Sequence, residues 1–152
     1  MDRIAHSIGH GLLAGLFGTA AMTVSSTLEA KARDRAGSTA PADAARTVLG
    51  IETFSGDAAE QRFSHLVHWG YGTGWGVARG LLRTLGLSPR AASVGHFALV
   101  YGSEQVLLPS LDVAPPATEW GATEVGIDAW HHLVYVVATA VAFEWLRARS
   151  QC

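Results

Sequence analysis

The residues best suited to chemistry are two histidines and two carboxylates in or beside long apolar stretches: His68, Glu104, Asp128 and His132. Asp128 and His132 are four residues apart and therefore share one face of a helix. Along their apolar stretches, His68, Glu104 and His132 lie at a similar depth, roughly 7 Å from one end at 1.5 Å per residue. We therefore expect three helices to bring imidazole and carboxylate groups to one level.

Three kinds of site fit this grouping. His68, Glu104 and His132 supply nitrogen and oxygen donors, which divalent metals such as zinc or iron accept. With Asp128 they could instead hold and pass a proton, because burial and neighbouring charges move the pKa values of carboxyl and imidazole groups. The third alternative is a structural cluster, in which Glu104 pairs with a histidine and fixes helix packing. No nucleophile and base at a recognisable spacing indicate an enzyme.

Other ionisable residues carry weaker signals. A haem between His10 and His96 is disfavoured, because chance pairs are common in a chain with seven histidines. Arg79 is expected to extend its side chain to the lipid headgroups. The single cysteine, Cys152, provides neither a disulfide framework nor a Cys-based metal motif.

Four apolar segments must position the candidate residues: 7–27, 63–82, 91–108 and 129–146. A helix through the first would be roughly 30 Å long, the thickness of a bilayer core. Only 16% of the residues are charged, against 49% hydrophobic. A soluble four-helix bundle would show a polar stripe along each helix, and none of the segments has one. The sequence predicts an all-α fold, an integral membrane four-helix bundle in a single transmembrane domain that spans residues 1–152.

The N-terminal part of the chain has a second interpretation. Arg3 before the first apolar run, and Ala30 and Ala32 after it, resemble a secretory signal with a small-residue cleavage site, although the run is long for one. Residues 29–62 are expected to form an extramembrane loop, with a short interfacial helix after Pro41.

Glycines are expected to pack the helices together, because lipid supplies no hydrophobic drive between helices and close backbone contact must replace it. The second helix has two ridges of glycines, which allow two neighbours. The residues concerned are Gly11 and Gly15 in the first helix, and Gly70, Gly72, Gly74, Gly76 and Gly80 in the second.

The distribution of charge predicts the topology. The loop 109–128 carries four acidic residues and no Lys or Arg, whereas the loop 83–90 and the C-terminal tail are basic. The positive-inside rule therefore predicts cytoplasmic termini and places the acidic loop and the His/carboxylate cluster at the outer leaflet. Lys31, Arg33 and Arg35 oppose this assignment, since they follow the first helix directly.

Two stretches carry a resemblance to a known family. The run Glu104-Gln-Val-Leu-Leu-Pro, the acidic Pro-containing loop after it, and Asp128-Ala-Trp-His-His-Leu-Val-Tyr resemble the C-terminal half of the YagU-type inner-membrane proteins of bacteria. Asp128, His132 and Tyr135 match the family's carboxylate and His-apolar-apolar-aromatic run, whereas Glu104 stands where the family has a histidine. The resemblance implies a small multi-spanning inner-membrane protein of unsettled role, connected with acid tolerance and dimeric.

Together these observations predict a multi-pass protein of a bacterial-type inner (plasma) membrane whose outer-leaflet cluster binds a proton or a divalent metal ion. The alternative is an accessory or structural subunit of a larger membrane complex, without chemistry of its own. The expected partners are the lipid bilayer and a homo-oligomer or larger complex. With 11 basic and 13 acidic residues, the chain lacks the positive charge that binds nucleic acid.

Overall fold

The computed structural model describes residues 2–150, and within them every regular element is a helix. Four long helices correspond to the four apolar segments, and two short ones lie in the connections. The elements are α1 (Asp2–Ala32), α2 (Ala40–Leu49), α3 (Asp57–Thr84), α4 (Pro89–Ser110), the 3-10 helix η1 (Ala117–Glu119) and α5 (Ala122–Arg149). The all-α expectation is confirmed.

The helices extend beyond the apolar segments that predicted them, because helix formation does not stop where charged residues begin. The connection between α1 and α3 is therefore residues 33–56, shorter than the expected loop 29–62, and it contains α2. The turn between α3 and α4 is defined locally: Gly86 adopts a φ of 86°, and the Ser88 hydroxyl accepts a hydrogen bond from the backbone N–H of Ala91 at 3.2 Å. A serine cap followed by Pro89 is a strong helix start.

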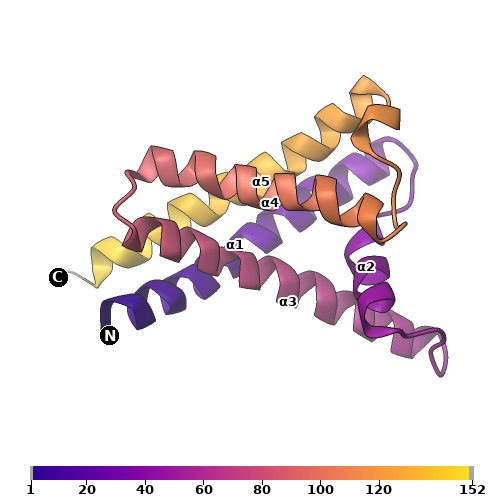
Figure 1. Cartoon of the computed structure of the whole chain (residues 1–152), viewed down its shortest axis with the longest axis horizontal. Helices are drawn as coiled ribbons and strands as arrows, with labels where there is room; N and C mark the ends of the chain where they lie inside the picture. The colour runs from indigo at the N-terminus through magenta and orange to yellow at the C-terminus, as the bar shows by residue number, and fades with distance from the viewer. Residues whose placement is uncertain (1, 151–152) are drawn as a thin grey trace.

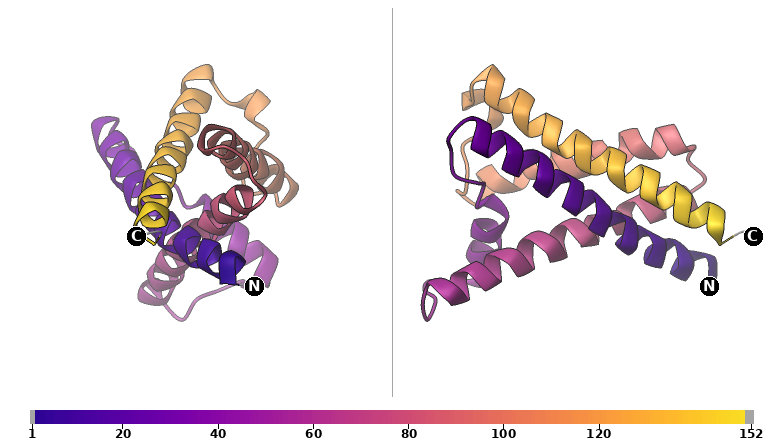
Figure 2. Two further views of the ribbon diagram at one scale, coloured as in Figure 1. Left: turned by 90° about the vertical axis from the view of Figure 1, so that its left-hand side faces the viewer. Right: turned by 180° about the vertical axis from the view of Figure 1, so that it is seen from behind.

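The four long helices run alternately up and down, so the start of α1 and the end of α5 lie at the same end of the molecule (Figure 1). Helix α1 lies between α3 and α5, and α4 covers the other side (Figure 2). Toward the end opposite the termini, α3 and α5 spread apart (Figure 2). Side chains on those two helices therefore meet different neighbours there.

Helices α1 and α3 cross with their backbones in direct contact. A Cβ atom placed on Gly76 would lie 2.7 Å from the Cα of Gly15 and closer still to the carbonyl oxygen of Gly11. Gly72 and Gly80 also face α1, against Thr19 and Ser7. One of the two predicted glycine ridges of α3 therefore packs against α1.

The other ridge, formed by Gly70 and Gly74, does not pack against another helix of this chain. No described residue lies within 4 Å of a Cβ placed on either glycine. The physical reason is the crossing: α1 occupies one face of α3, and α3 and α5 diverge on the other.

Hydropathy and length support two membrane spans among the described helices, not the four expected. Only Ile4–Ala32 in α1 and Ala122–Arg149 in α5 are long and apolar enough. Helix α3 carries charged residues in its first turns, and its small and aromatic residues have low hydropathy. In α4, residues 101–105 are polar or small, which lowers its hydropathy as well.

Candidate functional site

Three of the four expected site residues lie together at the end of the molecule opposite the termini. Glu104 comes from the last turns of α4, and Asp128 and His132 come from the first turns of α5. One possible ligand atom from each lies within 4.8 Å of the others. Their side chains are 19%, 24% and 10% exposed, so the site is largely shielded and still reachable.

His132 is held by both of its ring nitrogens. Nδ1 is 3.0 Å from the backbone carbonyl oxygen of Asp128, and 3.5 Å from the carboxylate Oδ1 of the same residue. A carbonyl oxygen can only accept, so Nδ1 carries the hydrogen and donates it. Nε2 lies 2.9 Å from the Oε2 of Glu104, an ion pair in which Nε2 donates when the imidazole is protonated. When the imidazole is neutral, its lone pair is on Nε2 and can bind a metal ion placed between the two atoms.

Helical spacing explains how the three side chains meet. Asp128 and His132 are one turn apart, so both project from α5 toward α4. The ring of Tyr101, on α4, lies 5.4 Å from the imidazole of His132, centre to centre. The amide Nε2 of Gln105 approaches Asp128 Oδ2 at 3.5 Å, on the same side of α4. Together these groups form a polar wall beside the cluster.

His68 does not join this cluster, which corrects the expected grouping of His68, Glu104 and His132 as metal ligands. Its Nε2 lies 2.8 Å from the hydroxyl of Thr23 on α1. His68 is one turn before Gly72 on the ridge of α3 that packs against α1. The crossing of α1 and α3 therefore directs this imidazole toward α1. The third possible ligand beside Glu104 and His132 is Asp128.

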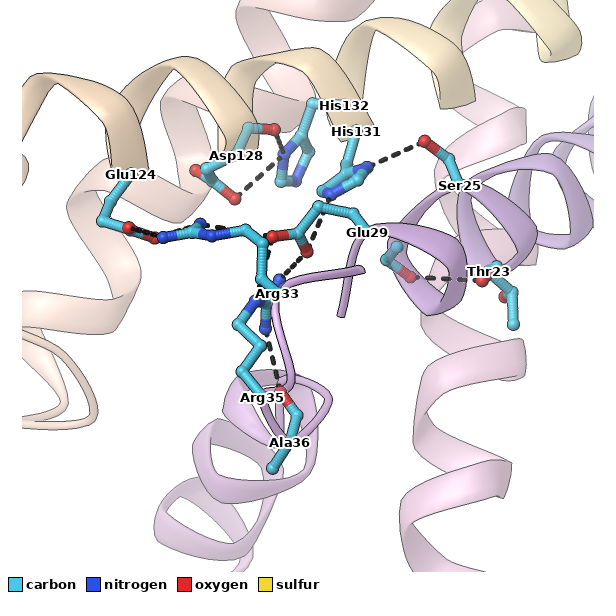
Figure 3. A network of polar contacts seen from close by, with 11 residues as sticks. Thr23, Ser25, Glu29, Arg33, Arg35, Ala36, Glu124, Asp128, His131 and His132 are labelled. Atoms are coloured by element: carbon cyan, nitrogen blue, oxygen red, sulfur yellow. Dashed lines mark hydrogen bonds and ion pairs between the residues drawn. The ribbon is translucent and has the colours of Figure 1, made fainter. Parts of the chain in front are cut away.

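A second polar network lies beside the cluster, on the α1 side of α5 (Figure 3). His131 has different partners from His132: its Nδ1 is 2.9 Å from the hydroxyl of Ser25, and its Nε2 is 3.6 Å from Glu29 Oε2 (Figure 3). Arg33 pairs with both Glu29 and Glu124, and Arg35 pairs with Glu29. These contacts attach the start of α5 to the end of α1.

The two carboxylates keep Arg33 charged. Its hydrogen bond with Glu124, and to a smaller extent that with Glu29, raises the pKa of the Arg33 guanidinium above its ordinary value. Two of the basic residues that oppose the predicted topology, Arg33 and Arg35, are thus each paired with a carboxylate.

The sequence holds a signal for this network that hydropathy does not show. Ser25, Glu29 and Arg33 are spaced four residues apart, so they form one polar ridge at the end of α1. Neighbouring residues on a helix point about 100° apart, so adjacent histidines such as His131 and His132 serve different neighbours.

Arg79 does not extend to the surface as expected. It is fully buried near the other end of the molecule, where Nη2 donates to Glu144 at 3.0 Å and Nη1 donates to Ser93 at 2.9 Å and to the carbonyl of Pro89 at 3.1 Å. Acceptors on α4 and α5 hold this guanidinium inside the bundle.

One imidazole and two carboxylates with a shared centre form a donor set suited to a divalent metal ion, and the same groups can exchange a proton. No family model, no curated protein and no solved structure matches this chain.

Proposed function

We propose that this chain is a four-helix membrane protein that binds a divalent metal ion through Glu104, Asp128 and His132. The observation that carries the proposal is the convergence of one ligand atom from each residue within 4.8 Å, with His132 Nε2 directed at Glu104. Metal-binding histidines usually donate their second ring N–H to a carbonyl or carboxylate, which fixes the ring. The contact between His132 Nδ1 and the Asp128 carbonyl has this form.

The types of ligand atom limit which metal ions the site can bind. Imidazole and carboxylate groups suit zinc, manganese or iron(II), whereas copper(I) prefers the sulfur of Cys or Met. Three protein ligands leave room for water or a substrate group, as in catalytic zinc sites. We therefore expect a site that exchanges a ligand at the metal, in place of a closed structural site.

The surface of the bundle supports membrane insertion. Large apolar side chains are exposed on each of the four long helices, for example Phe17 (58%), Leu66 (74%), Val94 (72%) and Val141 (67%). In α1 and in α5, only 28% of the 18-residue apolar stretch that identifies the span is buried, whereas the core helix of a soluble protein would be mostly buried. Lipid around all four helices, α3 and α4 included, would cover these side chains.

Charge supports an inner (plasma) membrane topology with both termini in the cytoplasm. The end that holds the termini carries Arg83, Arg90, Arg147 and Arg149, and the opposite end carries Asp112, Glu119 and the candidate site. Short basic segments stay in the cytoplasm. Lys31, Arg33 and Arg35 lie at the opposite end and oppose this orientation, since the rule counts Lys and Arg and their acidic partners do not offset them.

Membrane insertion is tested by phase separation of the expressed protein. We expect the chain to remain with the membrane after a high-salt, alkaline wash and to need detergent for extraction, because its exposed apolar surface cannot be hydrated without cost. Recovery of the folded protein in the aqueous phase without detergent would show that these helices do not cross a bilayer.

Metal binding is tested by titrating the detergent-solubilised, metal-free protein with zinc and measuring the dissociation constant. Loss of one ligand should weaken binding by at least about tenfold, since even the loss of an outer hydrogen-bond partner costs about 10–100-fold. We expect this result for Glu104→Gln and for His132→Ala. The matched control is Glu119→Gln, the same substitution at an exposed glutamate of the acidic loop.

The outcomes separate the three interpretations of the cluster. One zinc ion per chain that Glu104→Gln and His132→Ala weaken, and Glu119→Gln does not, supports the metal site. Binding that is equally strong in all variants places the metal elsewhere. If the wild-type protein binds no metal, the cluster is a proton site or a structural cluster, and measurement of proton flux in vesicles distinguishes these two.

A second candidate function is that of an accessory subunit. It is favoured by Gly70 and Gly74, whose notches on α3 face no part of the described chain. A helix of a larger complex, or of a second copy, would fit against them as small-residue ridges do in membranes. Co-purification with a stoichiometric partner, lost in Gly74→Leu, would favour this function. The YagU-type resemblance is compatible with either.

A further inference from the structure

A second charged cluster lies at the end of the bundle that holds the termini, far from the candidate metal site. Arg79 and Arg83, one turn apart on α3, both bind the carboxylate of Glu144 on α5, at 3.0 Å and 2.8 Å. Arg83 also donates to the carbonyl of Leu87 in the turn between α3 and α4. The cluster joins three of the four long helices.

The cluster has more positive than negative charge. Two guanidinium groups share one carboxylate, and the remaining acceptors of Arg79, a hydroxyl and a carbonyl, are neutral. The side chain of Arg79 is 0% exposed and that of Arg83 is 13% exposed. An unbalanced charge at this depth is costly unless an anion approaches it.

No second carboxylate in the adjoining segments supplies that anion. Residues 75–100 and 136–150, which form this end of α3, α4 and α5, contain five arginines and a single acidic residue, Glu144. The start of α1, at the same end, adds one charge of each sign, Asp2 and Arg3, so these segments leave the two guanidinium groups with more positive than negative charge.

The surroundings of Arg83 match the headgroup level of a bilayer. Leu85, in the adjoining turn, is 75% exposed, and Trp145, the residue after Glu144, is 50% exposed. Arg149 lies over the ring of Trp145, 4.1 Å from its centre. Tryptophan and arginine side chains with an exposed apolar neighbour are typical of the membrane interface.

We propose that Arg83 and Arg79 form a binding site for the headgroup phosphate of an anionic phospholipid. Arg83 contacts the phosphate at the rim of the cluster, Arg79 and Glu144 hold Arg83 in place, and the acyl chains lie along Leu85. Basic pockets between membrane helices on the cytoplasmic side bind anionic headgroups in this way. The inference rests on the proposed membrane insertion, and it is independent of the metal.

The test is a competition between phosphatidylglycerol and phosphatidylcholine of identical acyl chains, measured by native mass spectrometry of the detergent-solubilised protein in EDTA. Both lipids carry a phosphate, but only phosphatidylglycerol is anionic. We expect the wild-type protein to retain phosphatidylglycerol about fivefold more, the preference that one basic side chain near the surface provides. In Arg83→Gln the ratio should fall to about one, because Arg79 and Glu144 then balance each other.

The matched control is Arg90→Gln, which removes an exposed arginine at the same end and should keep the preference. The inference is overturned if the wild-type shows no preference, if Arg83→Gln keeps it, or if Arg90→Gln loses it equally, which would indicate diffuse attraction. Displacement of phosphatidylglycerol by millimolar inorganic phosphate would assign the site to free phosphate instead. Because EDTA removes metals, failure here leaves the zinc titration unaffected.

Discussion

Glu144→Gln is expected to lower the free energy of unfolding by about 3–5 kcal/mol, the cost of leaving a buried charge without its partner. Among the residues that the structure describes, Glu144 is the only carboxylate that binds the fully buried Arg79, and it binds Arg83 as well. The amide keeps the size of the side chain but removes its charge. Chemical denaturation in a mild detergent, followed by circular dichroism, measures the change.

Two further variants show whether the charge is responsible. Glu119→Gln, the same substitution at an exposed position, should change stability by less than about 0.5 kcal/mol. The double variant Arg79→Met with Glu144→Leu should recover most of the lost stability, because apolar residues often replace a buried ion pair without loss. A loss below about 1 kcal/mol in Glu144→Gln would contradict the buried-pair description.

Gly76→Ala is expected to cost about 3 kcal/mol or more, at the upper end of the range for overpacking. Its new methyl group would lie 2.7 Å from the backbone nitrogen and Cα of Gly15 and closer to the Gly11 carbonyl. Backbone atoms cannot rotate away as a side chain can, so α1 and α3 would have to separate. The same detergent denaturation measures the loss.

Gly74→Ala, two residues earlier on the same helix, is the matched control. No atom of the described part of the chain lies within 4 Å of its Cβ position, so the substitution should stabilise the helix by up to about 1 kcal/mol through its better helix propensity. The pair of variants thus predicts opposite signs from one chemical change. Equal effects at Gly74 and Gly76 would mean that α1 does not cross α3 as described.

The existence of the four long helices could be predicted from the sequence, because long apolar stretches such as 7–27, which has no charged residue, and 129–146, which has only Glu144, are typical of helices that are buried or in contact with lipid. Their ends could not, since a helix continues into polar residues as long as its backbone hydrogen bonds are made. The number of membrane spans could not be predicted from the absence of charge either. A helix such as α3 has few charged residues over most of its length, but its glycine and aromatic residues keep its mean hydropathy too low to identify it as a span.

The choice between the two glycine ridges of α3 depends on a neighbour that is distant in sequence. Gly70 and Gly72 look equivalent along the chain, and only the position of α1 distinguishes them. The same crossing determines the partner of His68, because this residue lies on the ridge that packs against α1 and contacts Thr23 there. The distance of a residue from the end of its apolar stretch therefore did not predict which side chains contact each other.

Local spacing was a better guide to the candidate site. The four-residue interval between Asp128 and His132 determines that they share a face, whatever the rest of the fold does. Glu104 reaches them because α4 and α5 are consecutive antiparallel helices that lie side by side there. The partners of His131 and of Arg79 belong to other helices, and no single-segment pattern could identify them.

The central claim, that Glu104, Asp128 and His132 bind one divalent metal ion, is tested most directly by X-ray absorption at the zinc edge of the loaded protein. If these three residues bind the metal, the spectrum should show only nitrogen and oxygen donors, at about 2.0–2.1 Å, with a single imidazole among them. The imidazole signal should disappear in His132→Ala and persist in His68→Ala. A sulfur donor at about 2.3 Å, two or more imidazoles, or a spectrum unchanged by His132→Ala would contradict the claim.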